Sequence, residues 1–339
     1  MVPPQLKNIV RILEYGLNTN SYKFALLRSL AEIAQETTQY RPIPYQSLAE
    51  KFLSYYWPLT ILFRIRQATD PTRDPVVMKF IRREAEELKL SPNYSLEKYR
   101  RAFPMRYSDL VHRCCQNGGC FDEVIPRFHV VPRQVIQPAI YSYSKNELFL
   151  DPDTVSFLRD YGSVIESLAI GSWVRFTEQY TNAPRLYEKI RGAKPERRHV
   201  RYRGFLLKLQ GDHCFYCQAE AGEMVAVDHV IPWCYVLEDR VWNLVLACKN
   251  CNSAKSNQTP ADHYIDELIN RNKTLLAEII GGKIAAASQE AVRDLREFIT
   301  KDIDEHIRTL TANCRADGFG TWRHCHLAHD VAEHGNQGV

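Results

Sequence analysis

Long hydrophobic runs are missing from this chain of 339 residues. No stretch approaches the roughly 18 consecutive apolar residues that a bilayer-spanning helix requires, and no signal peptide opens the sequence. Internal repeats and low-complexity tracts are missing as well. The sequence therefore predicts a cytoplasmic protein without a membrane segment, in which the ten cysteines are largely reduced. In such a setting, evenly spaced cysteine pairs indicate a metal site before a disulfide.

A strong excess of one charge sign is also absent, because the formal net charge is only +4. That balance does not by itself indicate a nucleic-acid partner. The distribution is more informative, since residues 185–208 hold nine Lys or Arg and two Glu. Such a run is either a solvated face or a phosphate-binding surface, and its place directly before a cysteine motif favours phosphate contact. The candidate contact residues are Arg197, Arg198, Arg201 and Arg203.

Composition and length indicate an ordinary globular protein with more than one domain. The hydrophobic fraction is 45% and the charged fraction 25%, and the length allows two or three cores. We expect a predominantly helical α+β chain in four parts. These are a mainly helical domain for target recognition or partner binding over residues 1–150, a connecting helix over 151–183, a cysteine-bearing domain with a basic lead-in over 184–275, and a helical segment with a loose tail over 276–339.

Several local patterns predict individual elements. Apolar residues recur on one helical face between Asn20 and Ala34. Ser47 and Glu50 form a capping-box pattern that would open a helix ending at Pro58. Further expected elements are helices over residues 76–88, 153–180 and 288–313, and a hairpin over residues 140–150.

Two cysteine pairs form the most specific pattern in the chain. Two residues separate Cys214 from Cys217 and Cys248 from Cys251, and thirty residues lie between the pairs. This spacing lets both sulfurs of a tight turn reach one zinc ion at about 2.3 Å, so that two pairs complete a tetrahedral site. Four thiolates leave no open coordination position, and the Zn²⁺ is therefore expected to be structural.

Polar residues suited to chemistry lie between and just after these pairs. An expected strand ends in Asp228 and His229, and Asn243 stands at the start of a second strand. Asn252 follows the last cysteine, where a helix is expected to begin and to carry Lys255 one turn later. Taken singly, each residue has a structural alternative: a satisfied strand-end pair, a turn residue, a helix cap and a solvated lysine.

Together, these residues and the order strand, loop, strand, helix resemble the HNH endonuclease family, in a four-cysteine zinc variant of its ββα-metal fold. The third family position is histidine in some members and asparagine in others, and Asn252 stands there in this chain. The flanking segments Trp242–Val245 and Asn252–Lys255 also look like the HNH domains of bacterial restriction and phage-defence proteins. The resemblance makes residues 184–275 an expected nuclease domain and says little about residues 1–150.

The resemblance implies a role for each of these residues. His229 would act as general base, because an ordinary imidazole has a pKa of about 6.5 and is mostly neutral at pH 7. Asp228 and Asn252 would bind one Mg²⁺ or Mn²⁺, hard cations that prefer oxygen ligands. Asn243 would brace the loop that carries His229, and Lys255 would touch a phosphate.

Three functions are compatible with this pattern. The first is a metal-dependent HNH endonuclease that hydrolyses phosphodiester bonds in double-stranded DNA, in restriction or phage defence, possible as a homodimer. The second is a nuclease subunit gated by a sensor partner of a defence system, which would engage the N-terminal helices. The third is a zinc-stabilised nucleic-acid-binding protein that no longer cuts.

The remaining cysteines lack a regular ligand spacing. Cys114, Cys115 and Cys120 could bind a second metal ion with nearby histidines, but their irregular spacing favours buried reduced thiols. A Cys/His-rich tail that includes Cys314 and Cys325 stays unassigned.

Overall fold

The computed structural model describes residues 3–36, 41–192, 196–220, 222, 225–282 and 289–324. Its contacts divide the chain into two units, residues 1–194 and 195–339. Both are mostly helical with small sheets, which confirms the predicted α+β class. The predicted four-part division is finer than these two units and stays a prediction. Residues 325–339, which include Cys325 and most of the predicted loose tail, lie outside the described residues.

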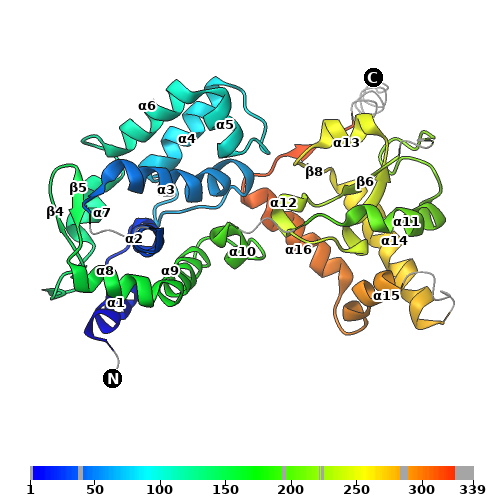
Figure 1. Ribbon diagram of the computed structural model, residues 1–339. Helices are drawn as coiled ribbons and strands as arrows, with labels where there is room; N and C mark the ends of the chain where they lie inside the picture. The colour runs from blue at the N-terminus through cyan, green and yellow to red at the C-terminus, as the bar shows by residue number, and fades with distance from the viewer. Residues whose placement is uncertain are drawn as a thin grey trace, which may run out of the picture. The chain divides into compact units, whose positions relative to one another are not determined.

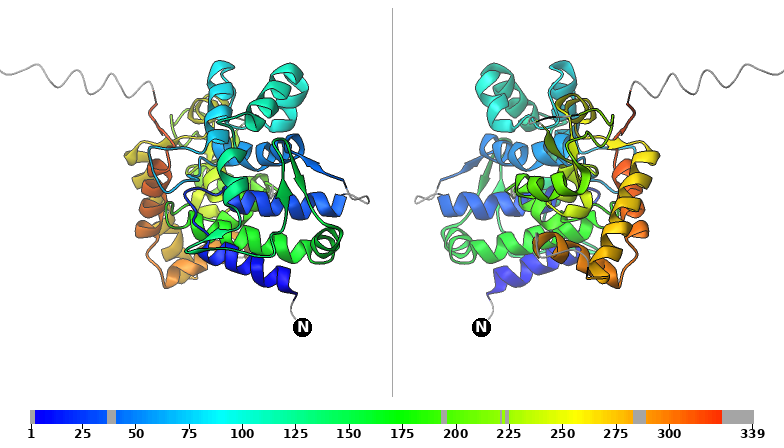
Figure 2. Two further views of the ribbon diagram at one scale, coloured as in Figure 1. Left: turned by 90° about the vertical axis from the view of Figure 1, so that its left-hand side faces the viewer. Right: turned by 90° about the vertical axis from the view of Figure 1, so that its right-hand side faces the viewer.

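In the first unit, helix α2 (Tyr22–Glu36) lies in the middle of the helices, with α3 on one side and α8 and α9 on the other (Figures 1 and 2). Its residues from Tyr22 to Ala31 are all buried, as expected for a helix covered on several sides. The helix predicted from the apolar residues between Asn20 and Ala34 is confirmed. The other helices of this unit are α1 (Pro4–Tyr15), α3 (Tyr45–Trp57), η1 (Pro58–Leu62), α4 (Val76–Glu87), α5 (Leu96–Ala102), α6 (Pro104–Cys115), α7 (Phe121–Arg127), α8 (Pro152–Asp160), α9 (Gly162–Thr177) and α10 (Leu186–Arg191).

The start of α3 differs from the prediction. The helix begins at Tyr45, with Pro44 at the N-cap position and no capping side chain. Proline has a fixed φ that suits the entry to a helix, so the helix starts upstream of Ser47 and the predicted capping box is wrong. The α-helix ends at Trp57 with Pro58 at the C-cap position, as predicted, and the chain continues into the π-helical turn η1.

Two small antiparallel sheets complete the first unit. Strand β5 (Glu147–Phe149) pairs with both β1 (Ile43–Pro44) and β4 (Ser142–Tyr143), so that Leu148 lies opposite Ile43 and Tyr143. This confirms the hairpin predicted over residues 140–150. Strands β2 (Val130–Val131) and β3 (Gln134–Val135) form the second sheet. The single helix predicted over residues 153–180 is wrong, since α8 and α9 are separate helices that meet at Tyr161.

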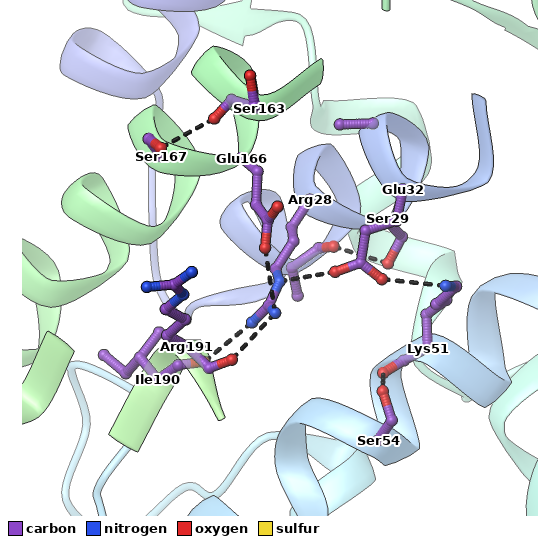
Figure 3. Close-up of polar contacts among 12 residues, drawn as sticks. Arg28, Ser29, Glu32, Lys51, Ser54, Ser163, Glu166, Ser167, Ile190 and Arg191 are labelled. Atoms are coloured by element: carbon purple, nitrogen blue, oxygen red, sulfur yellow. Dashed lines mark hydrogen bonds and ion pairs between the residues drawn. The ribbon is translucent and has the colours of Figure 1, made fainter. Parts of the chain in front are cut away.

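A buried arginine ties the end of α10 to the centre of this unit (Figure 3). Arg28 on α2 donates to the carbonyl oxygens of Ile190 at 2.9 Å and Arg191 at 3.1 Å. Its guanidinium also pairs with Glu32 at 2.9 Å and Glu166 at 3.3 Å. A cation at these carbonyls satisfies the unpaired end of the helix and complements its dipole.

The second unit is built around a short strand pair followed by a helix. Strands β6 (Ala226–His229) and β7 (Leu244–Ala247) are antiparallel, with His229 opposite Leu244, and helix α13 (Lys249–Lys255) follows β7. This is the predicted order of strand, strand and helix. The remaining elements are η2 (His199–Tyr202), α11 (Arg203–Gln210), α12 (Trp233–Val236), η4 (Val241–Asn243), β8 (Thr259–Pro260), α14 (Asp262–Ile280), α15 (Gln289–Arg296), η5 (Glu297–Ile299), α16 (Ile303–Ala316) and β9 (Thr321–Trp322).

The C-terminal helices form a core around η4 and β7. Arg271 on α14 is half-buried and donates to the carbonyl oxygens of Leu244 at 2.6 Å and Val241 at 3.0 Å, and desolvation of its guanidinium lowers its pKa to about 10. The ring of Trp242 packs against His306 on α16. The one long helix predicted over residues 288–313 is wrong, because α15, η5 and α16 replace it. None of the helices in the described part of the chain has the length and apolar character needed to span a bilayer.

Candidate active site and cysteine cluster

The four predicted zinc ligands meet at one point of the second unit. The sulfur atoms of Cys214, Cys217, Cys248 and Cys251 all lie within 4.8 Å of one another. The sulfurs of Cys217 and Cys248 are 3.9 Å apart. A tetrahedral site with Zn–S distances of about 2.3 Å requires sulfur separations of about 3.8 Å, so the cluster is close to the size of a Zn²⁺ site.

Each cysteine pair sits in a turn that fixes its sulfurs. The backbone N–H of Cys214 donates to Ala219 at 2.9 Å, and Gln218 adopts a left-handed φ of 59° to close this first turn. Cys248 is the N-cap of α13, where its sulfur accepts the N–H of Cys251 at 3.4 Å. Burial acts to raise the pKa of Cys248, but hydrogen bonds from Cys251 and the neighbouring thiols outweigh it and lower the pKa. The cluster therefore joins the turn before β6 to the helix after β7.

Asp228 lies near the end of β6 and is held by two side chains. The Tyr216 hydroxyl donates to Oδ2 at 2.7 Å, and Lys255 Nζ lies 3.1 Å from the same oxygen. Burial and the charge of Asp228 raise the pKa of Tyr216 well above its usual value, which keeps the phenol protonated as a donor. A carboxylate offers about four lone pairs. Oδ1, which is 3.4 Å from Lys255 Nζ, therefore keeps capacity to bind a cation.

Lys255 differs from both of its predicted environments. Its side chain is fully buried, and Nζ donates to the backbone oxygen of His229 at 2.8 Å in addition to pairing with Asp228. This burial contradicts the solvated alternative and speaks against the predicted phosphate contact. The lysine instead joins the last turn of α13 to the end of β6, because a buried ammonium requires nearby oxygen partners.

His229 is the last residue of β6 and is also largely buried. Its Nε2 lies 2.8 Å from Oδ1 of Asp239, a residue in the loop between α12 and η4. The side chain of Asp239 is 7% exposed, so its contact with His229 is shielded from water and salt. The backbone N–H of Arg198 also donates to Asp239. Sequence analysis did not identify this aspartate as a site residue.

A second imidazole lies beside the first. The ring centroids of His199, on η2, and His229 are 5.3 Å apart. Nδ1 of His199 is buried and has no hydrogen-bond partner among the described residues. Burial and the neighbouring His229 lower the pKa of His199, which favours the neutral ring. His199 was also missed, and it stands within the basic run of residues 185–208.

Asn243, the last residue of η4, holds the segment that follows β6. Its side-chain oxygen accepts the N–H of Ile231 at 2.8 Å, and its amide donates to the carbonyl of Ile231 at 2.9 Å. Its backbone oxygen accepts the N–H of Val230. These contacts hold the segment directly after His229, which is the place where the sequence predicted a bracing residue.

Asn252 lies on α13 one turn before Lys255. Positions three apart on a helix are neighbours on its surface, and Lys255 contacts both Asp228 and His229. Asn252 is half-buried, and its place on α13 is compatible with the predicted role as a cation ligand beside Asp228. One carboxylate oxygen and one amide oxygen suit Mg²⁺, which keeps several water ligands and takes few from the protein.

The predicted basic residues lie just before η2, within it and at the start of α11. Arg197, Arg198 and Arg201 are exposed, and Arg203 is half-buried. The guanidinium of Arg197 stacks 4.2 Å from the ring centroid of Trp233, and Arg198 pairs with Glu196 at 2.8 Å. The run therefore combines exposed cations with side chains fixed on neighbouring groups.

A weak signal for the missed residues exists in the sequence. Asp239 is an acidic residue four positions before Asn243, between two residues that were already assigned to the site. His199 is a histidine inside a basic run, and an arginine or lysine would suffice there if only positive charge were needed. Neither belongs to a periodic pattern, and their contacts with His229 arise only in the folded chain.

Comparison with known proteins gives two matches to family models. A domain of unknown function (DUF8808) matches residues 4–108, in the first unit. A family described as HNH endonuclease matches residues 214–261, in the second. No curated protein and no solved structure matches the chain. The predicted resemblance is confirmed over this second segment, which holds the four-cysteine cluster, the strand pair and helix α13, and residues 214–261 are thus similar to the HNH endonucleases.

Proposed function

We propose that the chain is a metal-dependent endonuclease that hydrolyses phosphodiester bonds in DNA. The observation that carries the proposal is that Asp228 and His229 are consecutive residues at the end of β6, each held by buried polar partners. Both lie in the segment that matches the HNH endonucleases, and the four-cysteine cluster holds the two ends of that segment together.

His229 would act as the general base. One ring nitrogen is held by Asp239, which leaves the other to accept a proton from water. The oxygen of that water forms a bond to phosphorus while the bond from phosphorus to the 3′ oxygen breaks, and the leaving oxygen takes a proton from solvent. General-base catalysis of this kind contributes about 10²- to 10⁴-fold in rate.

Asp228 and Asn252 would hold the divalent cation, Mg²⁺ or Mn²⁺. When bound, such an ion neutralises charge on the scissile phosphate and on the leaving oxygen. Tyr216 and Lys255 would orient the carboxylate of Asp228, since both donate hydrogen bonds to its oxygens. Lys255 would thus act through Asp228 and not through the phosphate.

The exposed arginines of η2 would bind the DNA backbone. Phosphate contacts position a protein on DNA but carry no sequence information, so target choice would come from the first unit, through recognition of DNA or of a partner protein. On the resemblance alone, we extend the proposal to double-stranded DNA, a role in restriction or phage defence, a possible homodimer and a cytoplasmic location.

A plasmid-cleavage assay in Mg²⁺ or Mn²⁺ tests the central proposal. The wild-type chain should cut, and His229→Ala should lower the rate by at least about 100-fold, because the general base is lost. EDTA should stop cleavage by the wild type. His112→Ala is a matched control, since His112 is an exposed histidine of α6 in the other unit, and it should cut at the wild-type rate.

The same assay separates the alternative functions. A wild-type chain that binds plasmid but leaves it intact in both metals would favour the non-cleaving binder or the gated subunit. Cleavage by the purified chain without a partner would remove the reason for a gate. Equal cleavage by the wild type and His229→Ala would refute His229 as the base.

A further inference from the structure

We propose that Asp239 positions His229, by holding the hydrogen of its ring on Nε2 and thereby leaving Nδ1 as the proton acceptor. Asp239 is not among the residues that sequence analysis assigned to the site. Its catalytic meaning rests on the proposed nuclease function, whereas the orientation of the ring can be measured without any cleavage.

The direction of the hydrogen bond follows from the partners of Asp239. Burial acts to raise the pKa of this carboxyl, but the hydrogen bonds from His229 and the backbone N–H of Arg198 lower it below its usual value. An ionised carboxylate is an acceptor only. At 2.8 Å from Asp239 Oδ1, Nε2 of His229 must therefore carry the hydrogen, and a neutral ring then has its lone pair on Nδ1.

The loop that carries Asp239 is fixed from outside the segment that matches the HNH endonucleases. Asp294 on α15 is 1% exposed and accepts the N–H of Val241 at 3.2 Å and a guanidinium N–H of Arg240 at 2.9 Å. The hydroxyl of Tyr202 donates to Asp294 at 2.7 Å and lies 3.3 Å from the carbonyl of Asp239. A buried carboxylate with three donors makes a rigid anchor.

Through Asp294, α15 contributes to the positioning of the loop that carries Asp239. Asp294 holds residues 239–241 on one side and η2 on the other through Tyr202. A base must be held within a fraction of an ångström of its working position. Since Asp239 touches the ring of His229 and not the substrate, its role is positioning.

The substitution Asp239→Asn tests the proposal with little change in shape. An amide presents a donor as well as an acceptor, so it can hold the opposite tautomer, in which Nδ1 carries the hydrogen. We expect the kcat for plasmid cleavage to fall by about 10²- to 10⁴-fold, the range found when such a carboxylate becomes an amide. KM should change by less than about threefold, because the loss affects the transition state and not DNA binding.

Asp212→Asn is a matched control. Asp212 lies 3.2 Å from Nδ1 of His213 in the same unit, and both side chains are about half exposed (58% and 48%). This variant breaks an aspartate–histidine pair that no step of the reaction uses, and its kcat should equal that of the wild type. Equal kcat values for Asp239→Asn and the wild type would overturn the positioning role.

Nitrogen NMR of the full wild-type chain tests the tautomer independently. With ¹⁵N-labelled histidine at about pH 8, where an ordinary ring is neutral, the signals of His229 should show Nε2 protonated and Nδ1 bare. His229→Gln identifies those signals by their loss. A ring protonated on Nδ1 would overturn the proposal even in a chain that cuts DNA. The expected tautomer in a chain that does not cut would count against a nuclease that acts unaided, while leaving the role of Asp239 in orienting the ring of His229.

Discussion

Single buried charges in the second unit are accommodated by several partners each. Lys255 Nζ has Asp228 Oδ2 at 3.1 Å, the backbone oxygen of His229 at 2.8 Å and that of Ser256 at 3.5 Å. Removing one member of a buried ion pair costs about 3–5 kcal/mol, because the other charge stays buried without compensation. The same lysine therefore stabilises the unit and holds Asp228 in place for a cation.

At residue scale, His129 should make the first unit sensitive to acid. Its Nε2 accepts the N–H of Ile140 at 2.9 Å. Burial, followed by the charge of Lys23, lowers its pKa from 6.5 to about 4. As the pH falls from 6.5 to about 4, the unfolded chain binds the proton before the folded chain does, so the free energy of unfolding decreases. The contribution is fully present above pH 6.5, and about 2 kcal/mol of it should be lost between pH 7 and pH 5.

Urea unfolding of the first unit at these two pH values measures the effect. The variant His129→Gln keeps a polar side chain but cannot titrate, so its free energy of unfolding should change less between pH 7 and pH 5. Parallel changes in the wild type and the variant would show that other groups cause the acid sensitivity.

Sequence alone identified residues whose chemistry depends on spacing along the chain. The four cysteines were predictable because a two-residue spacing suffices to place two sulfurs on one ion. Asp239 and His199 were not, since each reaches His229 through the fold and belongs to no repeating pattern. The burial of Lys255 could not be predicted either, because a sequence gives the residue type and not the oxygen atoms that surround it in the fold.

At the scale of elements, the strand pair and α13 are too small to form a stable unit without help. β6 and β7 have four residues each and α13 has seven, and isolated two-stranded ribbons are marginally stable in water. The cysteine cluster and α14 supply the missing stability, the first by joining the ends of the motif and the second through Arg271. The geometry of the proposed active site would therefore depend on a zinc ion held by the cluster.

The variant Cys248→Ser tests that dependence. Serine can still serve as the N-cap of α13, so the substitution mainly removes one sulfur ligand. The purified protein should contain less than one Zn²⁺ per chain, and the second unit should unfold at a lower temperature, because binding energy at a structural zinc site is folding energy. Zinc content and thermal unfolding by circular dichroism measure both effects.

Cys234→Ala is the control for this substitution. Cys234 is a buried cysteine of α12, in the same unit but outside the cluster. That variant should keep a full complement of zinc, with at most a modest loss of stability from the smaller side chain. A normal zinc content in Cys248→Ser would exclude the four-thiolate site.

The sequence predicted a helix correctly where apolar residues recur on one helical face. It did not predict where some helices begin or break. The apolar face of α2 fixed its position, but α3 begins where Pro44 permits and not at the Ser47 capping pattern. No proline marks the break between α8 and α9 at Tyr161 in the sequence. Such boundaries depend on tertiary packing, which overrides weak local preferences.

At the scale of the whole molecule, the two units have separate buried cores and separate family matches. The described part of the chain has one cluster of metal-ligating residues, and it lies in the second unit. The first unit is packed from helices around α2, with no such cluster among its described residues. Each unit should therefore respond to a different change of conditions.

We expect the full chain to unfold in two transitions, since units with independent cores do not follow a two-state scheme. A strong zinc chelator should lower the temperature of one transition and leave the other in place, because ligands that bind only the folded state stabilise only the unit that holds them. Cys248→Ser should lower the same transition, whereas a shift from pH 7 to pH 5 should lower the other through His129. Differential scanning calorimetry with and without chelator resolves the two. A single transition that moves as a whole with chelator would show that the units fold as one, and the nuclease segment would then depend on the first unit for its stability.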